Sequence, residues 1–496
     1  MSEELSDIRT QRIEKIKELE KKGKRAYPLR FPRDTQIKNI FENWDENKPQ
    51  TVRIAGRIKA KRVMGKIAFA NLEDMSGNIQ LYVKTDVVGA EGFEMFTTLD
   101  LGDIVGVHGE SFTTQKGEKS VRVDSFELLA KCLRPLPSVK EQDGKVFNEF
   151  ADKEMKYRQR YIDLIVNRQT RNDFIVRSRA ISAIRRFLEG RGFLEVETPM
   201  MHPIAGGAAA KPFITHHNAL DMKLFMRIAP ELYLKRLVVG GFERVFEMNR
   251  NFRNEGIDTR HNPEFTMVEM YQAYTDYEGM MELAESLYSA VTKEVLGTTT
   301  ISYQGQAIEL GTPWKRVKYV DIVKERTGID FSTIKTADEA RAAAKSVGVK
   351  IDDDETSIWK IADEVFSERV EETLVQPTFM TDYPKELSPL AKSREDNPDY
   401  VERFELFIAG REMANAFTEL NDPFDQKARF EEQVKMREAG DDEAQMMDLD
   451  YIAALEYGLP PAGGMGIGID RLIMILVDTA SIKDTILFPL LRPEIK

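Results

Sequence analysis

The stretch RVFEMNRNFRNEGIDTRHNPEFTMVEMYQAY, residues 244–274, consists of two apolar segments joined by a densely charged turn. The turn contains Arg253, Glu255, Arg260 and His261. The flanking segments are rich in aromatic and β-branched residues, which predicts two strands and hence a β-hairpin. A solvated hairpin with cross-strand ion pairs would explain any one of these charges. Together, the charges favour a binding site at the tip.

Each strand of this hairpin is expected to carry one unusual face, because every second side chain of a strand points the same way. The shared faces are Glu247, Asn249, Asn251 and Arg253 on the incoming strand, and Phe265, Met267, Glu269 and Tyr271 on the outgoing strand. Such faces make a poor core and a good pocket floor.

The residue types of the hairpin indicate the kind of ligand. Arginine offers a planar fork to phosphate or carboxylate. A phenylalanine ring can stack on a base, so the combination suits a nucleoside triphosphate.

The glycine-rich stretch GGMGIGIDR, residues 463–471, is a second candidate for nucleotide binding. It departs from the G-x-G-x-x-G pattern because Ile469 stands at the last glycine position, and the chain contains no G-x-x-x-x-G-K-[ST] loop. We expect a turn whose glycines let the backbone approach a flat ligand closely. Arg471 would then lie at the start of a helix, where the helix dipole also favours phosphate.

Composition restricts the class of protein. The 496 residues carry a net charge of −12 and include one cysteine, Cys132, and five histidines. An internal disulfide framework is excluded, a structural zinc site is disfavoured, and a reducing, cytoplasmic location fits. No apolar run approaches the ~20 residues that span a bilayer, and the N-terminus lacks the apolar region of a secretory signal. We therefore expect no membrane partner.

The chain is expected to divide into four parts. Residues 1–50 form an N-terminal extension with a helix over 5–22, residues 51–132 contain five short strand patterns typical of a small antiparallel barrel, and residues 133–150 form a linker. Residues 151–496 mix helices and strands without regular alternation, which favours an α+β fold on an antiparallel sheet, with a helical insertion around 310–400. Basic runs at 21–33 and 53–72 suit nucleic-acid phosphates or a solvated face.

Three segments resemble, in order and spacing, the motifs of the class II aminoacyl-tRNA synthetases. They are FLEGRGFLEVETPMM (187–201), the hairpin with its approach (242–274) and GGMGIGIDRLIM (463–474). The barrel resembles the OB-fold anticodon-binding domain of the aspartate, asparagine and lysine subgroup. Within that subgroup, APELYLKRL (229–237) and GREMANAFTELNDPFDQKARF (410–430) are most similar to bacterial lysyl-tRNA synthetases. The resemblance covers nearly the whole chain.

The resemblance implies a homodimeric, lysine-specific ligase. Such an enzyme activates L-lysine with ATP as co-substrate, releases pyrophosphate and transfers lysine to the 3′ end of tRNA(Lys). An aspartyl- or asparaginyl-type synthetase, a lysyltransferase paralogue and a non-catalytic RNA-binding paralogue are the alternatives. The first is disfavoured because an aspartate-charging enzyme needs a cation where Glu419 stands. Lysyltransferase paralogues lack the barrel, which this chain is expected to have. A non-catalytic paralogue should have lost Arg253, Arg471 or the glutamate pair described below, and all of these are present.

A site for free lysine needs a carboxylate for the ε-ammonium, an acceptor for the α-amine and a cation for the α-carboxylate. In MANAFTEL, residues 413–420, Asn415, Phe417 and Glu419 occupy alternate positions and so share one face of a strand. The predicted lysine-binding residues are Gly207, Glu231, Arg253, Tyr271, Asn415, Phe417 and Glu419. Glu419 would bind the ε-ammonium with Tyr271 as hydroxyl partner, while Phe417 lines the aliphatic stem. Glu231 would take the α-amine and Arg253 the α-carboxylate; the resemblance supports both and adds Gly207.

The resemblance further implies that ATP is bound by Arg253, Glu255, His261, Asn262, Phe265, Glu405 and Arg471. Arg253 and Arg471 would be the catalytic residues, since phosphoryl transfer of this kind needs positioning and neutralisation of charge rather than a protein nucleophile. Phe265 would stack on adenine and Glu255 would bond its amine. Asn262 would support the turn, and His261 would either contact phosphate or serve as a structural hydrogen-bonding group.

Glu405 and Glu412 match the metal-binding pair of the family, which implies Mg²⁺ as cofactor; an exposed hairpin is the alternative. They flank a predicted two-residue loop at Ala409–Gly410. Strict alternation would place Glu412 and Asn415 on opposite faces, so we predict a β-bulge near Ala414.

In the barrel, the resemblance implies that Phe69 stacks on an anticodon base and that Gln80 hydrogen-bonds it. Taken alone, these two side chains would suit a core phenylalanine and an exposed glutamine.

Overall fold

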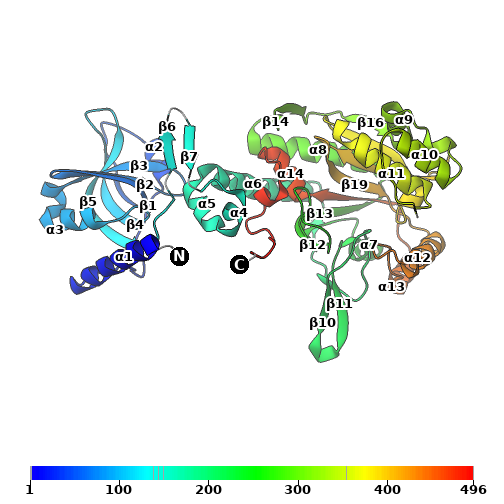
Figure 1. The fold of residues 1–496 in the computed structure, drawn as a ribbon, viewed down its shortest axis with the longest axis horizontal. Helices are drawn as coiled ribbons and strands as arrows, with labels where there is room; N and C mark the ends of the chain where they lie inside the picture. The colour runs from blue at the N-terminus through cyan, green and yellow to red at the C-terminus, as the bar shows by residue number, and fades with distance from the viewer. Residues whose placement is uncertain (1–2, 138, 143–144, 149, 354, 495–496) are drawn as a thin grey trace. The chain divides into compact units, whose positions relative to one another are not determined.

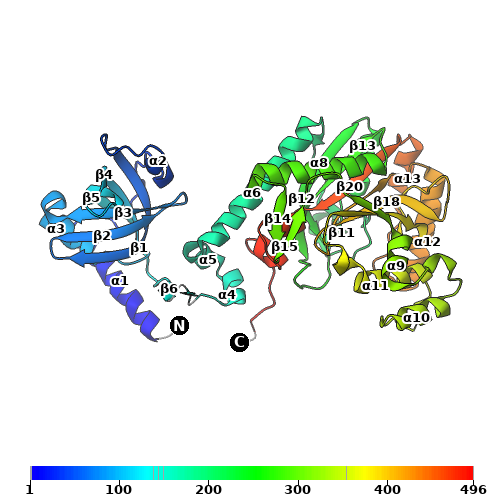
Figure 2. The ribbon, with the colours of Figure 1, turned by 90° about the horizontal axis from the view of Figure 1, so that it is seen from above.

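The computed structural model describes residues 3–137, 139–142, 145–148, 150–353 and 355–494 (Figures 1 and 2). The chain separates into two compact units, Met1–Ala151 and Asp152–Lys496. Among the described residues, no helix has both the length and the apolar character needed to cross a membrane.

A closed five-stranded barrel makes up most of the first unit (Figure 1). Its strands, in the order β1-β2-β3-β5-β4, are β1 (Thr51–Met64), β2 (Ile67–Glu73), β3 (Asn78–Lys84), β5 (Lys119–Ala130) and β4 (Ile104–Thr113). The five strand patterns of the sequence are all strands, and their apolar positions, such as Leu72 and Leu81, fill the interior. Helix α3 (Thr85–Thr98), between β3 and β4, was not predicted.

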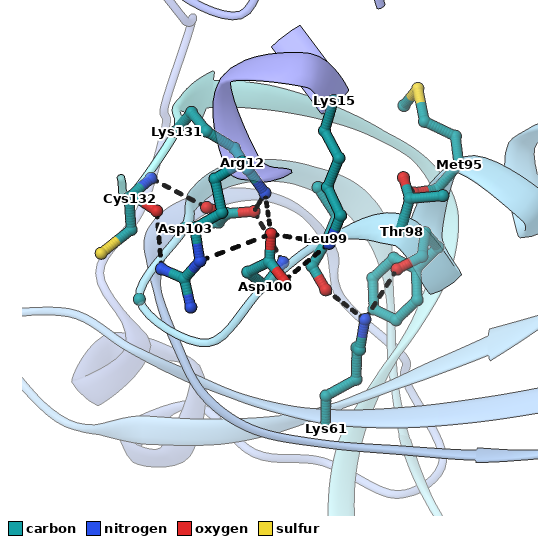
Figure 3. A network of polar contacts seen from close by, with 12 residues as sticks. Arg12, Lys15, Lys61, Met95, Thr98, Leu99, Asp100, Asp103, Lys131 and Cys132 are labelled. Atoms are coloured by element: carbon teal, nitrogen blue, oxygen red, sulfur yellow. Dashed lines mark hydrogen bonds and ion pairs between the residues drawn. The ribbon is translucent and has the colours of Figure 1, made fainter. Parts of the chain in front are cut away.

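A helix precedes the barrel, as predicted: α1 spans Glu3–Lys21 and is followed by α2 (Ile37–Glu42). Figure 3 shows how α1 is held against the barrel, with Asp100 surrounded by basic side chains. Lys15 donates to Asp100 Oδ1 (2.8 Å) and Arg12 Nε lies 3.8 Å from Asp100 Oδ2. Lys131, almost fully buried, joins Asp100 (2.5 Å) to Asp103 (2.7 Å). These partly buried ion pairs attach α1 to its barrel.

Within residues 133–150, predicted as a linker, β6 (Val139–Gln142) and β7 (Lys145–Asn148) pair as a small antiparallel sheet. Residue 138, which is the last of the stretch LRPLPS (133–138) at the start of the predicted linker, lies outside the described residues.

The second unit is built on an eight-stranded sheet, which agrees with the predicted α+β class. Its strands, in order, are β16 (Lys315–Lys318), β17 (Thr378–Pro384), β18 (Tyr400–Phe407), β19 (Glu412–Thr418), β20 (Ala462–Gly468), β13 (Glu264–Ala273), β12 (Arg244–Phe252) and β8 (Leu194–Glu195). Neighbouring strands are antiparallel except for β16 with β17 and β12 with β8.

Three helices cover one face of this sheet: α6 (Arg168–Gly190), α8 (Tyr277–Leu296) and α14 (Ile469–Leu476) (Figure 1). Their apolar side chains form the main core with the sheet residues Val268 and Met270 of β13. The alternate residues of β13, including Glu269 and Tyr271, belong to the opposite face. That face is therefore free to line a ligand site.

The remaining elements lie around this framework. They are α4 (Lys153–Arg158), α5 (Arg160–Val166), α7 (Glu231–Val239), α9 (Tyr319–Thr327), α10 (Ala337–Ser346), α11 (Ile358–Arg369), α12 (Pro423–Glu438), α13 (Leu449–Glu456) and α15 (Ile482–Thr485), with β9 (Met201–His202), β10 (Ile214–His217), β11 (Met222–Met226), β14 (Thr300–Tyr303) and β15 (Gln306–Glu309). Residues 310–400 contain α9, α10 and α11, but also β16 and β17 of the main sheet.

One prediction from the sequence was wrong in this unit, and one helix was not predicted. The missed helix is α7, in which Glu231, Leu234, Lys235 and Val238 are buried with a helical period. The glycine-rich stretch was expected to be a turn, yet it is the central strand β20, which pairs with β13 and β19. Tertiary pairing outweighs the low strand propensity of glycine there.

The predicted β18–β19 hairpin is confirmed in detail. Ile408 and Arg411 exchange backbone hydrogen bonds (3.0 and 3.2 Å) across the loop residues Ala409 and Gly410, which both have positive φ. Phe407 pairs with Glu412 while Leu406 pairs with Ala414, so one residue of β19 is extra. This is the bulge expected next to Ala414. It lets Glu412 and Asn415 border the same cavity.

Candidate active site

A cavity of about 380 Å³ lies on the face of the sheet opposite α6 and α8. The sequence-predicted residues that line it are Gly207, Glu231, Arg253, Glu255, His261, Asn262, Phe265, Tyr271, Glu412, Asn415, Phe417 and Arg471. They come from five parts of the chain, which only the fold brings together. Glu405 and Glu419 are absent from this lining and lie behind it.

The β12–β13 hairpin supplies one end of the cavity. Arg253 bonds through its backbone N–H to the carbonyl of Pro263 (2.9 Å), and its guanidinium lies 5.2 Å from the centre of the Phe265 ring. Asn262 is buried and donates to the carbonyl of Glu264 (2.6 Å), so it stabilises the turn. A cation and an aromatic face thus border the same space.

Arg471 and His261 meet at this end as well. Arg471, in the first turn of α14, donates to the Glu412 carboxylate (3.0 Å) and to its carbonyl (2.8 Å). Its other terminal nitrogen lies 3.4 Å from His261 Nε2. His261 Nδ1 is 2.9 Å from Asp258, so the ring is oriented by the turn itself. Arg471 and Arg253 therefore present two positive charges to the cavity, as a polyphosphate requires.

The polar face predicted for the incoming strand does not form a pocket floor. Glu247, Asn249 and Asn251 are absent from the cavity lining. The reason is Arg227, which is fully buried and binds Glu247 Oε1 at 2.6 Å. This ion pair covers the face, and only Arg253 of that set borders the cavity.

Glu231 and Glu419 lie at the other end of the cavity and share a partner that the sequence analysis missed, Lys235. Lys235 Nζ binds Glu231 Oε1 (2.6 Å) and Glu419 Oε2, and it lies 5.2 Å from the centre of the Phe417 ring. Lys235 and Glu419 are buried. The signal for Lys235 was its position four residues after Glu231, which places both on one face of α7.

Negative charge is unfavourable at this inner end. Burial raises the pKa of Glu419 to about 8, against the opposing effect of Lys235. Burial, and then the charge of Glu231, raise the pKa of Glu269 to about 8. Burial also raises the pKa of Tyr271 well above its usual range. A bound cation would relieve this accumulation of carboxylates, so the inner end suits an ammonium group.

Glycines of β20 make room for these groups. A Cβ atom on Gly464 would lie 2.7 Å from Cδ1 of Tyr271 and would overlap Oε1 of Glu419. A Cβ atom on Gly207, where φ is +90°, would lie 3.0 Å from Cβ of Glu231. Both positions therefore require glycine if Glu231, Tyr271 and Glu419 are to keep their places.

Glu405 is held beside Glu412 by a separate set of contacts. Arg403 Nη2 binds Glu405 Oε1 (2.5 Å), and the Tyr383 hydroxyl donates to Oε2 (2.8 Å). Arg403 also donates to Asn415 Oδ1 (3.0 Å), which fixes that amide at the cavity wall. Burial, and then the charges of Glu412 and Asp363, raise the pKa of Glu405 to about 7 against the effect of Arg403.

The barrel carries a second candidate site on its outer surface. Phe69 and Gln80 are only partly buried, on the face of β2 and β3 opposite the core positions. The Phe69 ring lies 5.4 Å from the Tyr82 ring, which lies 5.5 Å from Phe112, and Arg62 stands 5.8 Å from Phe69. Tyr82 and Phe112 were not predicted from the sequence, although Tyr82 alternates with Gln80. A row of aromatic rings beside a cation is typical of a surface that binds single-stranded nucleic acid.

Comparison with known proteins agrees with this geometry. Residues 152–492 match the family model of tRNA synthetases class II (D, K and N), and residues 52–129 match that of an OB-fold nucleic acid binding domain. The lysine–tRNA ligase of Carboxydothermus hydrogenoformans is 57% identical over 493 residues, covering 99% of each chain. Those of Bacillus subtilis and Staphylococcus aureus are each 52% identical, over 99% and 100% of this chain and 98% and 100% of their own. The chain therefore belongs to the class II tRNA synthetases of the aspartate, lysine and asparagine group.

Proposed function

We propose that this protein is a lysine–tRNA ligase that forms lysyl-adenylate in the cavity of its second unit. The observation that supports lysine most directly is the pair of carboxylates, Glu231 and Glu419, at the inner end. Relatives more than 50% identical over nearly the whole chain carry the name lysine–tRNA ligase.

The lysine substrate would lie along the cavity with its side chain inward. Its ε-ammonium meets Glu419 beside Tyr271, its stem packs on Phe417, and its α-amine meets Glu231. Arg253 then binds the α-carboxylate at the outer end. Asn415, oriented by Arg403, supplies an amide at the wall between these ends.

ATP would occupy the outer end, with adenine stacked on Phe265 and its amine near Glu255. A carboxylate oxygen of lysine attacks the α-phosphorus, and the bond to the pyrophosphate oxygen breaks. Arg253 and Arg471 stabilise the charge that develops on the phosphoryl oxygens. In the second step the terminal ribose hydroxyl of tRNA attacks the lysyl carbonyl and AMP leaves. Holding both reactants in line contributes much of the rate.

Mg²⁺ fits the donors present. It prefers hard oxygen ligands and is usually bound through one or two carboxylates together with substrate phosphates. Glu405 and Glu412 are such carboxylates, and the charge of Glu412 raises the pKa of Glu405, so a cation shared by both would be stabilised. When bound, the ion would neutralise charge on the triphosphate.

The barrel would bind the anticodon of tRNA(Lys). Phe69, Tyr82 and Phe112 offer stacking faces, Gln80 lies across from Asn71 on the neighbouring strand, and Arg62 adds positive charge. The exposed basic residues of 21–33 and 53–72 would contact phosphates.

We further propose a homodimer in the cytoplasm. Apolar side chains are exposed near the first motif and on the sheet formed by β9, β10 and β11, namely Leu194, Met201, Ile214, Leu220 and Met222. The β10–β11 hairpin projects from its unit (Figure 1). Sedimentation equilibrium should give twice the 56.8 kDa chain mass. A monomer at micromolar concentration would contradict the dimer.

The function is tested by ATP–pyrophosphate exchange with each of the twenty amino acids. Lysine should give the dominant signal, because a neutral or acidic side chain would leave Glu419 Oε1 buried without a partner. Exchange driven by aspartate or asparagine would reverse the substrate assignment. Absence of exchange with every amino acid, despite retained tRNA binding, would indicate a non-catalytic RNA-binding protein.

A further inference from the structure

Lys235 is a buried cation that the proposed reaction does not use. Its side chain is fully buried behind the cavity wall, yet its ammonium contacts both carboxylates assigned to the two amines of the substrate. It reaches Glu231 Oε1 at 2.6 Å and Glu419 Oε2, one oxygen of each carboxylate. An isolated buried lysine would be costly, so these two contacts account for its presence.

The other oxygen of Glu419 is available to a ligand. Glu419 Oε1 is buried and forms no hydrogen bond. It lies against Gly464 and the Tyr271 ring, both of which line the cavity. A buried carboxylate oxygen without a partner is destabilising by itself, and an ammonium at this end of the cavity would satisfy it.

We propose that Lys235 is a positioning residue for recognition of lysine, which ties down one oxygen of Glu231 and one of Glu419 so that both carboxyl groups ionise more readily and turn their other oxygens to the substrate amines. This inference rests on the proposed placement of lysine in the cavity. It explains why a site for a cation contains a resident cation. Without a resident cation, two or three buried carboxyl groups would retain their protons and lose their affinity for ammonium groups.

The groups that face Glu419 come from three elements. Lys235 and Glu231 belong to α7, Tyr271 to β13 and Tyr451 to α13. Glu269 of β13 adds a further carboxyl close to Tyr271. Lys235 is the member of this set that lowers the pKa of Glu419, whereas the charge of Glu231 raises it. Removing the charge of Lys235 therefore moves the pKa of Glu419 further above about 8.

The test is the variant Lys235→Met, assayed by lysine-dependent pyrophosphate exchange between pH 6.5 and 8.5. We expect the KM for lysine at pH 7 to rise about tenfold or more, since each pKa unit corresponds to a factor of ten in the ionised fraction. The wild-type KM should fall as pH rises and begin to level off above about pH 8, whereas that of the variant keeps falling to the end of the range as Glu419 ionises. The KM for ATP and the kcat at saturating lysine should change less than about twofold.

Controls separate this role from a structural one. Lys293→Met, at an exposed lysine in the last turn of α8, should match the wild type. Combining Lys235→Met with Glu419→Gln should raise the KM by less than the product of the two single effects, because both variants act on the interaction with the substrate ε-ammonium. If Lys235→Met does not fold, Lys235→Gln carries the same test with a smaller expected rise.

A KM for lysine that is unchanged in Lys235→Met, or one that rises with the wild-type pH profile and in parallel with the KM for ATP, would overturn the inference. If instead Glu419→Gln alone leaves the KM for lysine unchanged, the placement of lysine itself is wrong. The two failures are therefore distinguishable.

Discussion

In the proposed function, the choice of amino acid depends most on one side chain, Glu419. Replacing it in Glu419→Gln keeps its shape but leaves the substrate ammonium without a charged partner, which costs about 3–5 kcal/mol. We expect lysine-dependent pyrophosphate exchange to fall about 10²–10³-fold in kcat/KM. A change of less than about threefold would show that another group binds the ammonium.

Glu269 gives a prediction about pH and stability. A glutamate in an unfolded chain titrates near 4.3, whereas burial raises the pKa of Glu269 in the folded protein to about 8. Folding thus takes up a proton between these values, and the contribution of Glu269 to the free energy of unfolding falls as pH rises from about 4.3 to about 8.

The variant Glu269→Gln removes this dependence. Relative to wild type, its free energy of unfolding should rise between pH 5.5 and pH 7.5 by on the order of 1 kcal/mol per pH unit. Urea unfolding at the two pH values measures the difference. Glu282→Gln, at an exposed position of α8, should show no such trend. A free energy of unfolding that falls in the variant, relative to wild type, as pH rises would contradict this prediction.

At the scale of elements, β20 forms the wall between the two ends of the cavity. In Gly464→Ala the new methyl group would displace Tyr271 or the Glu419 carboxylate. A misplacement of about 1 Å in such a site lowers activity on the order of 10²-fold. We expect this loss in kcat/KM for lysine, together with a loss of stability of about 1–3 kcal/mol from overpacking. Gly190→Ala, at the end of α6 where no atom lies within 4 Å, is the matched control.

The elements also show where local pattern sufficed. Alternation of apolar and polar residues predicted the β12–β13 hairpin and the barrel strands, and the need to bring Glu412 and Asn415 to one pocket predicted the bulge beside Ala414. Helix α7 was missed because it is short, Glu231–Val239, and begins directly after Pro230. Its burial at every third or fourth residue depends on contacts with β13 and α13.

At the scale of the whole molecule, the two units should divide the reaction. Phe69→Ala removes a stacking face from the barrel, and base stacking is worth about 1–3 kcal/mol. The KM for tRNA in aminoacylation should rise about 5–150-fold, whereas lysine-dependent pyrophosphate exchange should be unchanged. Val87→Ala, at an exposed position of α3, controls for general effects. Equal loss in both assays would show that the barrel is needed for activation itself.

The sequence by itself predicted the class of fold, the three motifs and twelve residues of the cavity lining, through strand patterns, turn residues and charge within short segments and through the resemblance that these segments carry. The tertiary structure alone decided the rest. It placed GGMGIG as a central strand, buried Glu247 under Arg227, and joined Glu231 to Glu419 through Lys235. Glu419 and Lys235 stand 184 positions apart, and a buried ion pair forms between such residues only when a complete core excludes water around both.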